Sequence, residues 1–155
     1  MLDARRHDRA AFDCGDLALD AYLHKYALQQ AVKGISSVFV LVDDAQPGTI
    51  LGFYSLGAAQ IDAQQLGEAE RKKLPRYPVP CFRMGRLARD MKHRGTGVGA
   101  ILIGLAVARC LKAQAQVGAY ALLVDAKNAK AKAFYHRYGF IAGQDAPMTL
   151  YLPSG

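Results

Sequence analysis

The stretch HRGTGVGAIL, residues 93–102, carries three glycines at alternate positions and runs directly into an apolar segment. Glycine adopts backbone torsions that are closed to other residues. Glycines before a helix also let amide N–H groups approach phosphate oxygens, with the positive end of the helix dipole behind them. The stretch therefore predicts a phosphate-binding loop that opens a helix.

Two common phosphate-binding motifs account poorly for this loop. A Walker A loop needs Lys and then Ser or Thr after its last glycine, whereas Ala and Ile follow Gly99. A dinucleotide fingerprint does fit the spacing of Gly95, Gly97 and Ala100. Asp125 even lies at a suitable distance along the chain for a ribose contact. That fold, however, needs more strand–helix units than the sequence offers on either side of the loop.

Length and composition predict a single domain over residues 1–155. Hydrophobic residues make up 52% of the chain, so it can form a substantial core. The longest apolar run, residues 100–108, is too short to span a bilayer, and the charged N-terminus does not resemble a signal peptide. Three widely spaced cysteines contain no CxxC pair, which predicts reduced thiols and no metal site. We expect a cytoplasmic protein without a membrane partner.

The net charge of +7 is concentrated in two short segments. Residues 83–94 hold five basic residues and one acid, and residues 127–137 hold four basic residues and no acid. Positive charge concentrated in this way predicts that a polyanion binds there, and we interpret this polyanion as a nucleic-acid backbone. The candidate RNA-binding residues are Arg83, Arg86, Lys130, Lys132 and Arg137.

Hydrophobic periodicity predicts a mixed α/β domain. Its expected order is a helix, a hairpin, and then alternating strands and helices, and the strand–helix–strand crossover favours parallel neighbours. On the helix that follows the loop, Ile101, Leu105 and Ala108 form the predicted apolar stripe. The predicted helices are 16–33, 98–116 and 128–138, and the predicted strands are 37–43, 49–60, 81–90, 119–124 and 148–152.

Two motifs resemble the GNAT acetyltransferases. Arg94, Gly97 and Gly99 match the R/Q-x-x-G-x-G/A pattern of that family. Downstream, NAKAKAFYHRYGF, residues 128–140, resembles its N-x-x-A-x-x-F-Y-x-x-x-G-F segment. The two motifs occur in the right order at the right separation, and the resemblance covers nearly the whole chain. It implies the GNAT fold, an α/β architecture with a central mixed β-sheet flanked by helices.

The resemblance also implies an acetyl-CoA site. Backbone groups before the loop would hold the pantetheine arm, amides of the loop would hold the pyrophosphate, and Tyr135 would protonate the leaving thiolate. Phe134 and Tyr138 are interpreted as core residues. The cofactor-binding residues implied in this way are Leu87, Ala88, Arg89, Arg94, Gly95, Thr96, Gly97, Val98, Gly99 and Asn128.

The acceptor amine is predicted from the strand before the loop. This strand is rich in arginine, and its only acid, Asp90, lies at its end, so the site suits a cationic lysine or polyamine poorly. An α-amine has a lower pKa and needs less help from a base.

Four segments resemble a subfamily, the GNAT toxins of bacterial toxin–antitoxin modules: FDCGDLALDAYL (12–23), GFYSLG (52–57), VPCFRMGRLARD (79–90) and MTLYLP (148–153). That resemblance implies acetylation of aminoacyl-tRNA, a homodimer, a ribbon-helix-helix antitoxin, and contact with operator DNA only through that antitoxin. A GNAT enzyme for a small-molecule or protein amine and a non-catalytic RNA- or partner-binding module remain as alternatives.

Overall fold

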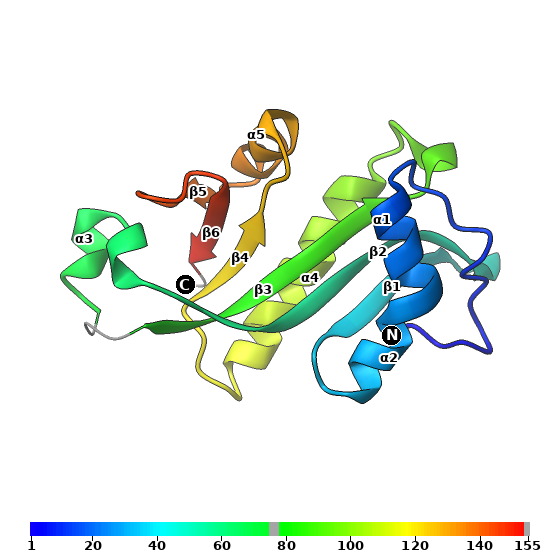
Figure 1. Ribbon diagram of the computed structural model, residues 1–155, viewed down its shortest axis with the longest axis horizontal. Helices are drawn as coiled ribbons and strands as arrows, with labels where there is room; N and C mark the ends of the chain where they lie inside the picture. Colours follow the sequence, from blue (N-terminus) through cyan, green and yellow to red (C-terminus); the bar gives the residue numbers. More distant parts are fainter. Residues whose placement is uncertain (75–77, 154–155) are drawn as a thin grey trace. The chain divides into compact units, whose positions relative to one another are not determined.

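The computed structural model describes residues 1–74 and 78–153 and contains a six-stranded sheet with strand order β1-β2-β3-β4-β6-β5 (Figure 1). Strands β3 and β4 are parallel, while β1–β2, β4–β6 and β5–β6 are antiparallel. The predicted mixed α/β order is therefore confirmed. The elements are α1 (Leu17–Ala21), a π-helical turn η1 (Tyr22–Tyr26), α2 (Ala27–Val32), β1 (Ser37–Asp43), β2 (Gln46–Ile61), η2 (Ala63–Gln65), α3 (Glu68–Arg71), β3 (Val79–Arg89), η3 (Met91–His93), α4 (Val98–Gln114), β4 (Ala121–Asp125), α5 (Ala129–Arg137), β5 (Ile141–Ala142) and β6 (Thr149–Pro153).

The chain divides into two compact units. The first unit comprises residues 1–57 and 85–107, and the second comprises residues 58–84 and 108–155. Strands β2 and β3 and helix α4 each contribute residues to both units.

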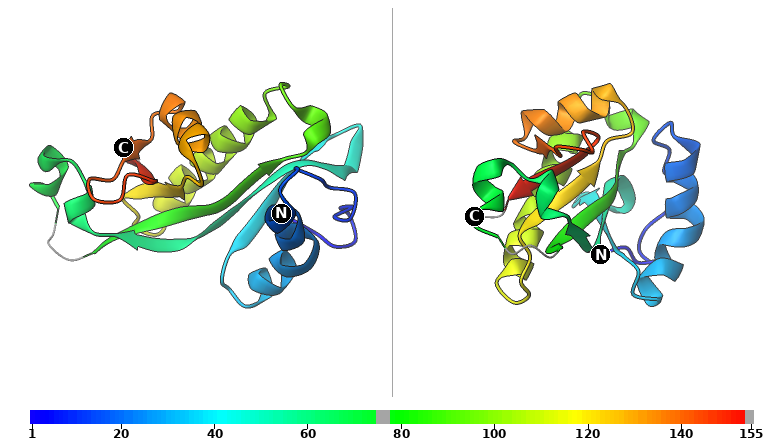
Figure 2. Two further views of the ribbon diagram at one scale, coloured as in Figure 1. Left: turned by 45° about the horizontal axis from the view of Figure 1, so that its top comes forward. Right: turned by 60° about the vertical axis from the view of Figure 1, so that its left-hand side comes forward.

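In the first unit, one run of helix packs against the β1–β2 hairpin (Figure 2). The Asp16 carboxylate caps the start of α1 by accepting the amides of Ala18 and Leu19. Within the π-helical turn, Tyr22 and Leu23 are buried, whereas Tyr26 at its end is 50% exposed. The buried cluster consists of Leu2, Phe12, Tyr22, Leu23, Ala27, Val38, Ile50, Phe53 and Ala88.

In the second unit, β4 lies between β3 and β6. Its residues 121–124 are all buried, which confirms the buried strand that the continuous apolar run predicts. The last residue of β4, Asp125, is exposed. The buried cluster consists of Ile61, Ala63, Leu66, Val79, Cys81, Ala121, Leu123 and Tyr151.

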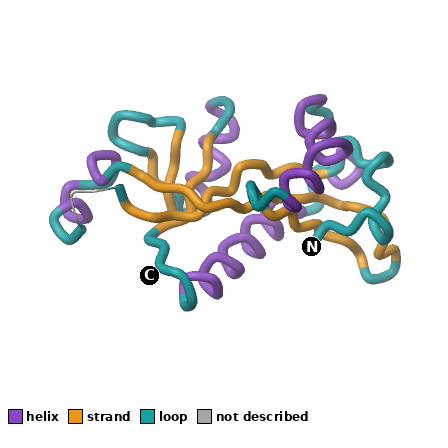
Figure 3. Tube along the Cα trace, turned by 60° about the horizontal axis from the view of Figure 1, so that its bottom comes forward, coloured by secondary structure: helices purple, strands orange, loops and turns teal. Residues whose placement is uncertain are grey.

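Helix α4 is one continuous helix (Figure 3). Its buried face differs from the predicted one. Ile101 and Leu105 are 49% and 44% exposed, and Ala108 is also exposed. The helix is apolar on almost every side, so periodicity alone does not select the face that packs. No helix among residues 1–74 and 78–153 is long and apolar enough to cross a membrane. The buried side chains of α4 are Val98, Leu102, Ile103, Ala106 and Cys110.

The three cysteines are free thiols. Cys81 and Cys110 are buried, and Cys14 is partly buried. Burial raises the pKa of both Cys14 and Cys110 to about 11, so neither thiol is ionised near neutral pH. In the described part of the chain, no group of three or more His, Cys, Asp or Glu residues is placed to hold a metal ion.

Candidate active site

The glycine loop connects η3 to α4 in the first unit. Gly95 and Gly97 have φ values of +77° and +82°, a region that L residues with a side chain rarely adopt. A Cβ at either position would meet no atom within 4 Å, so the backbone conformation, and not crowding, requires glycine here. The residues at 94–97 are exposed, while Val98 is buried and anchors the start of α4.

The loop that the sequence predicts to bind phosphate leads directly into the N-terminus of α4. The amide of Ile101 donates to the carbonyl of Gly97 at 3.1 Å in the first turn of α4. The amides of Val98, Gly99 and Ala100 precede that bond, and the amides of a first helical turn have no partner within the helix. Together with the helix dipole of this 17-residue helix, they favour a bound phosphate.

Buried Asp90 fixes the start of this loop. One of its carboxylate oxygens accepts the amide of Lys92 at 2.9 Å, and the other accepts the amide of Asp13 at 3.2 Å. Backbone bonds from Asp90 to the carbonyl of Leu51 and from Met91 to the carbonyl of Asp13 complete the attachment. Because both oxygens accept backbone amides and the residue is only 6% exposed, Asp90 is poorly placed to act as a general base.

The residues expected to hold the pantetheine arm form the end of β3. Ala88 is buried, whereas Leu87 and Arg89 are partly buried. Among the described residues, the Nε atom of Arg89 is buried and has no hydrogen-bond partner. Contact of these three residues with acetyl-CoA stays a prediction.

In the second unit, Tyr135 lies on α5 and is only 9% exposed. Its ring packs edge-on against Phe134 and Phe140, with ring centroids 5.6 Å and 5.5 Å apart. Burial, and then the negative charge of Asp125, raises the pKa of Tyr135 to about 12. The phenol therefore keeps its proton at neutral pH, as a proton donor must. Tyr138, expected in the core, is the C-cap residue of α5 and is 37% exposed.

Asn128 caps α5. Its side-chain oxygen accepts the amide of Ala131 at 2.9 Å, and its φ and ψ values of −160° and 176° are typical of an N-cap residue. The cap uses only the side-chain oxygen, and the side-chain NH₂ is a separate donor group. Its predicted contact with the acetyl-CoA arm is compatible with the capping role but stays a prediction.

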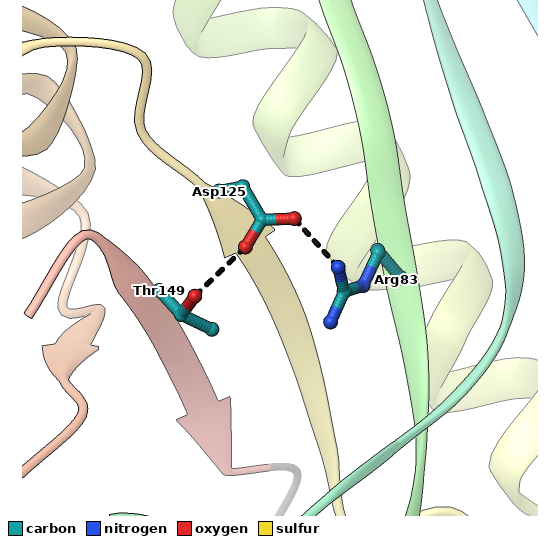
Figure 4. A network of polar contacts seen from close by, with 3 residues as sticks. All are labelled: Arg83, Asp125 and Thr149. Atoms are coloured by element: carbon teal, nitrogen blue, oxygen red, sulfur yellow. Dashed lines mark hydrogen bonds and ion pairs between the residues drawn. The ribbon is translucent and has the colours of Figure 1, made fainter. Parts of the chain in front are cut away.

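A polar network that the sequence did not predict lies at the end of β4 (Figure 4). One carboxylate oxygen of Asp125 accepts a hydrogen bond from Arg83 at 2.6 Å, and the other accepts one from Thr149 at 2.9 Å. The sequence alone indicates Asp125 only as a possible ribose contact of a dinucleotide site. Its position at the end of a buried apolar strand was the available signal, because polar side chains at strand ends are often functional.

Two of the predicted RNA-binding residues have different neighbours. Arg83 pairs with Asp125 in the second unit, whereas the Arg86 guanidinium lies 3.8 Å from the ring centroid of buried Tyr22 in the first.

Helix α5 separates the remaining basic residues. Lys130 and Arg137 are seven residues apart, so they share one face of the helix, and both are exposed. Lys132 projects from a different face and is partly buried. RNA binding by these residues stays a prediction.

Comparison with known proteins places this geometry in a family. Residues 34–142 match the acetyltransferase (GNAT) domain. The tRNA-acetylating toxin of Mycobacterium tuberculosis is 36% identical over 145 residues, which are 94% of this chain and 85% of the relative. The probable toxin TacT of Sinorhizobium fredii is 29% identical over 98% of this chain and 88% of its own length. Among solved structures, AtaT complexed with acetyl-methionyl-tRNAfMet has a TM-score of 0.91 at 31% identity, covering 97% of this chain and 89% of AtaT.

The chain belongs to the GNAT acetyltransferases. Within this family its similarity to toxins extends over almost its entire length, and the AtaT fold is the same. Further solved relatives are AtaTR with acetyl-CoA (TM-score 0.82), AtaT with the C-terminus of the antitoxin AtaR (0.82) and AtaT-AtaR with DNA (0.77).

Proposed function

We propose that this protein transfers the acetyl group of acetyl-CoA to the α-amino group of an aminoacyl-tRNA. The observation that carries this proposal is a buried, protonated Tyr135 within a chain that resembles tRNA-acetylating toxins over nearly its full length. An acetylated α-amine has lost the nucleophile that forms a peptide bond. The reaction would therefore inhibit translation.

The glycine loop fits the donor. Amides of Gly95, Gly97, Val98 and Gly99 would hold the pyrophosphate, and the exposed Arg94 would add positive charge beside it. The Thr96 amide, also predicted to bind there, donates to the carbonyl of His93 at 3.3 Å. Acetyl-CoA supplies the activated thioester. The end of β3 and Asn128 would hold its arm.

Tyr135 provides the proton for the leaving group. In the transfer, the amine nitrogen bonds to the acetyl carbon, the carbon–sulfur bond breaks, and the Tyr135 hydroxyl gives its proton to the sulfur. The proton released by the amine restores the phenol through solvent. A pKa of about 12 keeps the phenol protonated between turnovers.

The environment of Asp90 favours an α-amine over a lysine amine. Asp90 is the only acid in the strand-to-loop segment 83–94, and backbone amides occupy both of its oxygens. A lysine amine, with a pKa near ~10.4, needs a base at neutral pH, whereas an α-amine, with a pKa near ~8, needs far less help.

The biological setting that we propose is a cytoplasmic toxin–antitoxin module. The protein would act as a homodimer, a ribbon-helix-helix antitoxin would neutralise it, and the pair would contact operator DNA through the antitoxin. Structures of AtaT with the AtaR C-terminus and of AtaT-AtaR with DNA support this setting by similarity.

Incubation with labelled acetyl-CoA and total charged tRNA tests the proposed function. We expect the label to appear on charged tRNA and to be lost after mild alkaline deacylation, with none on deacylated tRNA. Label on protein or polyamine acceptors alone would favour a different GNAT activity. RNA binding without any transfer would favour a non-catalytic module.

A further inference from the structure

The Arg83–Asp125 ion pair has a short distance between its charged groups but is partly exposed to solvent. Its N···O distance is 2.6 Å, while the two side chains are 40% and 50% exposed. Ion pairs that face solvent contribute only about 0–1 kcal/mol to stability. Stability is therefore a poor reason for placing this pair at the end of a buried strand.

The carboxylate is held from two sides. Asp125 is paired with Thr149 in the β4–β6 register, and the Thr149 hydroxyl donates to one carboxylate oxygen. Arg83 reaches the other oxygen from β3, where its backbone pairs with Leu123 of β4 (Figure 4). If Arg83 moves away, Thr149 still orients the carboxylate.

The same carboxylate acts on the proton donor. After burial, the charge of Asp125 is the second cause of the raised pKa of Tyr135. The ion pair and the phenol also belong to the same compact unit of the chain.

We infer that the Arg83–Asp125 pair recognises the charged end of the acceptor: Asp125 binds the α-ammonium group, and Arg83 turns to a phosphodiester of the same tRNA end. This inference rests on the proposed function. The aminoacylated end of a tRNA carries one cationic amine and nearby anionic phosphates. Asp125 therefore exchanges the cationic Arg83 for the cationic amine, and Arg83 exchanges the anionic Asp125 for an anionic phosphate. No charge is left without a counter-charge, and the amine is bound in the same unit as Tyr135.

Asp125 and Arg83 bind the acceptor, and Thr149 is a positioning residue. The ammonium loses its proton to solvent before its nitrogen attacks, so Asp125 is not required as the base. Amine acceptors without a phosphate would use only Asp125. Acceptors that carry both charges would use the whole pair.

Steady-state kinetics of four variants test the inference with total charged tRNA as the acceptor. For Asp125→Asn and Arg83→Ala we expect kcat/KM for charged tRNA to fall tenfold or more, while KM for acetyl-CoA stays within twofold. In Arg83→Ala the slope of log kcat/KM against log salt should shrink by about one, because one phosphate contact is lost. For Thr149→Val we expect a higher KM for charged tRNA with a smaller change in kcat. Lys33→Ala, which removes an exposed charge at the end of α2, is the control and should match the wild type in all these constants.

A charge-swapped double variant separates recognition from a structural role. Arg83→Asp combined with Asp125→Arg keeps an ion pair between β3 and β4 but exchanges the two charges. Recognition predicts that this variant melts like the wild type and stays at least tenfold impaired. Restored activity would overturn the inference, as would wild-type kinetics of Arg83→Ala. If the wild-type protein itself transfers no label to charged tRNA, the proposed function fails instead.

Discussion

Tyr135 combines the two properties that a proton donor to a thiolate requires. Its hydroxyl belongs to a side chain that is fixed by aromatic packing against Phe134 and Phe140, and its raised pKa leaves it protonated at neutral pH. Burial accounts for most of this shift, with Asp125 as the second cause.

Replacement of Tyr135 by Phe removes the proton and keeps the packing. We expect kcat to fall about 10²- to 10⁴-fold, the range of general acid–base catalysis, with KM for acetyl-CoA nearly unchanged. Tyr138→Phe on the same helix is the matched control, because that side chain is 37% exposed and should leave turnover unchanged. Turnover of Tyr135→Phe close to that of the wild type would exclude Tyr135 as the acid.

The raised pKa of Tyr135 predicts a loss of stability in alkali. Between pH 10 and 12 the unfolded state releases this proton and the folded state retains it, so the free energy of unfolding falls as the pH rises. Relative to Tyr135→Phe, the wild type should lose about 1–3 kcal/mol over this interval. Urea unfolding at pH 8, 10 and 11 measures the difference, and parallel curves for the two proteins would show that the pKa is not raised.

The sequence indicates some residues of the candidate site and not others. Tyr135 follows from the motif that surrounds it. Asp125 does not, because only the fold brings Arg83 and Thr149 to its two oxygens. For the same reason the sequence could not distinguish Arg83, which faces a carboxylate, from Arg86, which stacks on Tyr22.

Among the elements, the glycine loop depends on backbone conformation. Gly97 has a φ of +82°, where a Cβ is strained even though space is available. Gly97→Ala should destabilise the protein by about 1–2 kcal/mol and raise KM for acetyl-CoA. Gly104→Ala, in the open middle of α4, should instead be neutral or stabilise by about 0.5–1 kcal/mol. Thermal melts and acetyl-CoA kinetics of the two variants check this contrast, and equal effects of both would contradict it.

The attachment of the loop through Asp90 makes a second prediction at this scale. Asp90→Asn keeps one acceptor oxygen and turns an NH₂ group toward an amide, so one backbone amide loses its partner. We expect a loss of about 1–3 kcal/mol in stability and a higher KM for acetyl-CoA, with kcat less affected. The control is Asp44→Asn, an exposed acid in the hairpin turn. A large fall in kcat with unchanged KM would indicate that Asp90 takes part in the chemistry.

Element order and type were predictable where hydrophobic periods are clear, as in β1 and α5. The buried face of α4 was not, because Ile101 and Leu105 are as apolar as the buried Leu102 and Ile103. Strand β3 begins at Val79, two residues before the predicted start, since Pro80 is accommodated within it. The π-helical turn η1 has no signal in the periodicity, because it is a change in hydrogen bonding over only five residues.

For the whole molecule, the predicted site residues are distributed over both compact units. The first unit contains the glycine loop and Asp90, and the second contains Tyr135, Asp125, Lys130 and Arg137. Overall family and fold were predictable because two motifs occur in the order and separation of GNAT enzymes. The acceptor could be inferred only from charge and resemblance.

Mass spectrometry of the terminal nucleoside tests the central claim most directly. Total charged tRNA is incubated with acetyl-CoA and the protein and is then digested with nuclease to release the aminoacyl-adenosine. We predict one or more aminoacyl-adenosines heavier by one acetyl group, located on the α-nitrogen by fragmentation, and an initial rate of formation at least about 10²-fold lower with Tyr135→Phe at the same enzyme concentration. Unmodified aminoacyl-adenosines after full incubation with the wild-type protein, under conditions in which it hydrolyses or transfers from acetyl-CoA to another amine, would contradict the account.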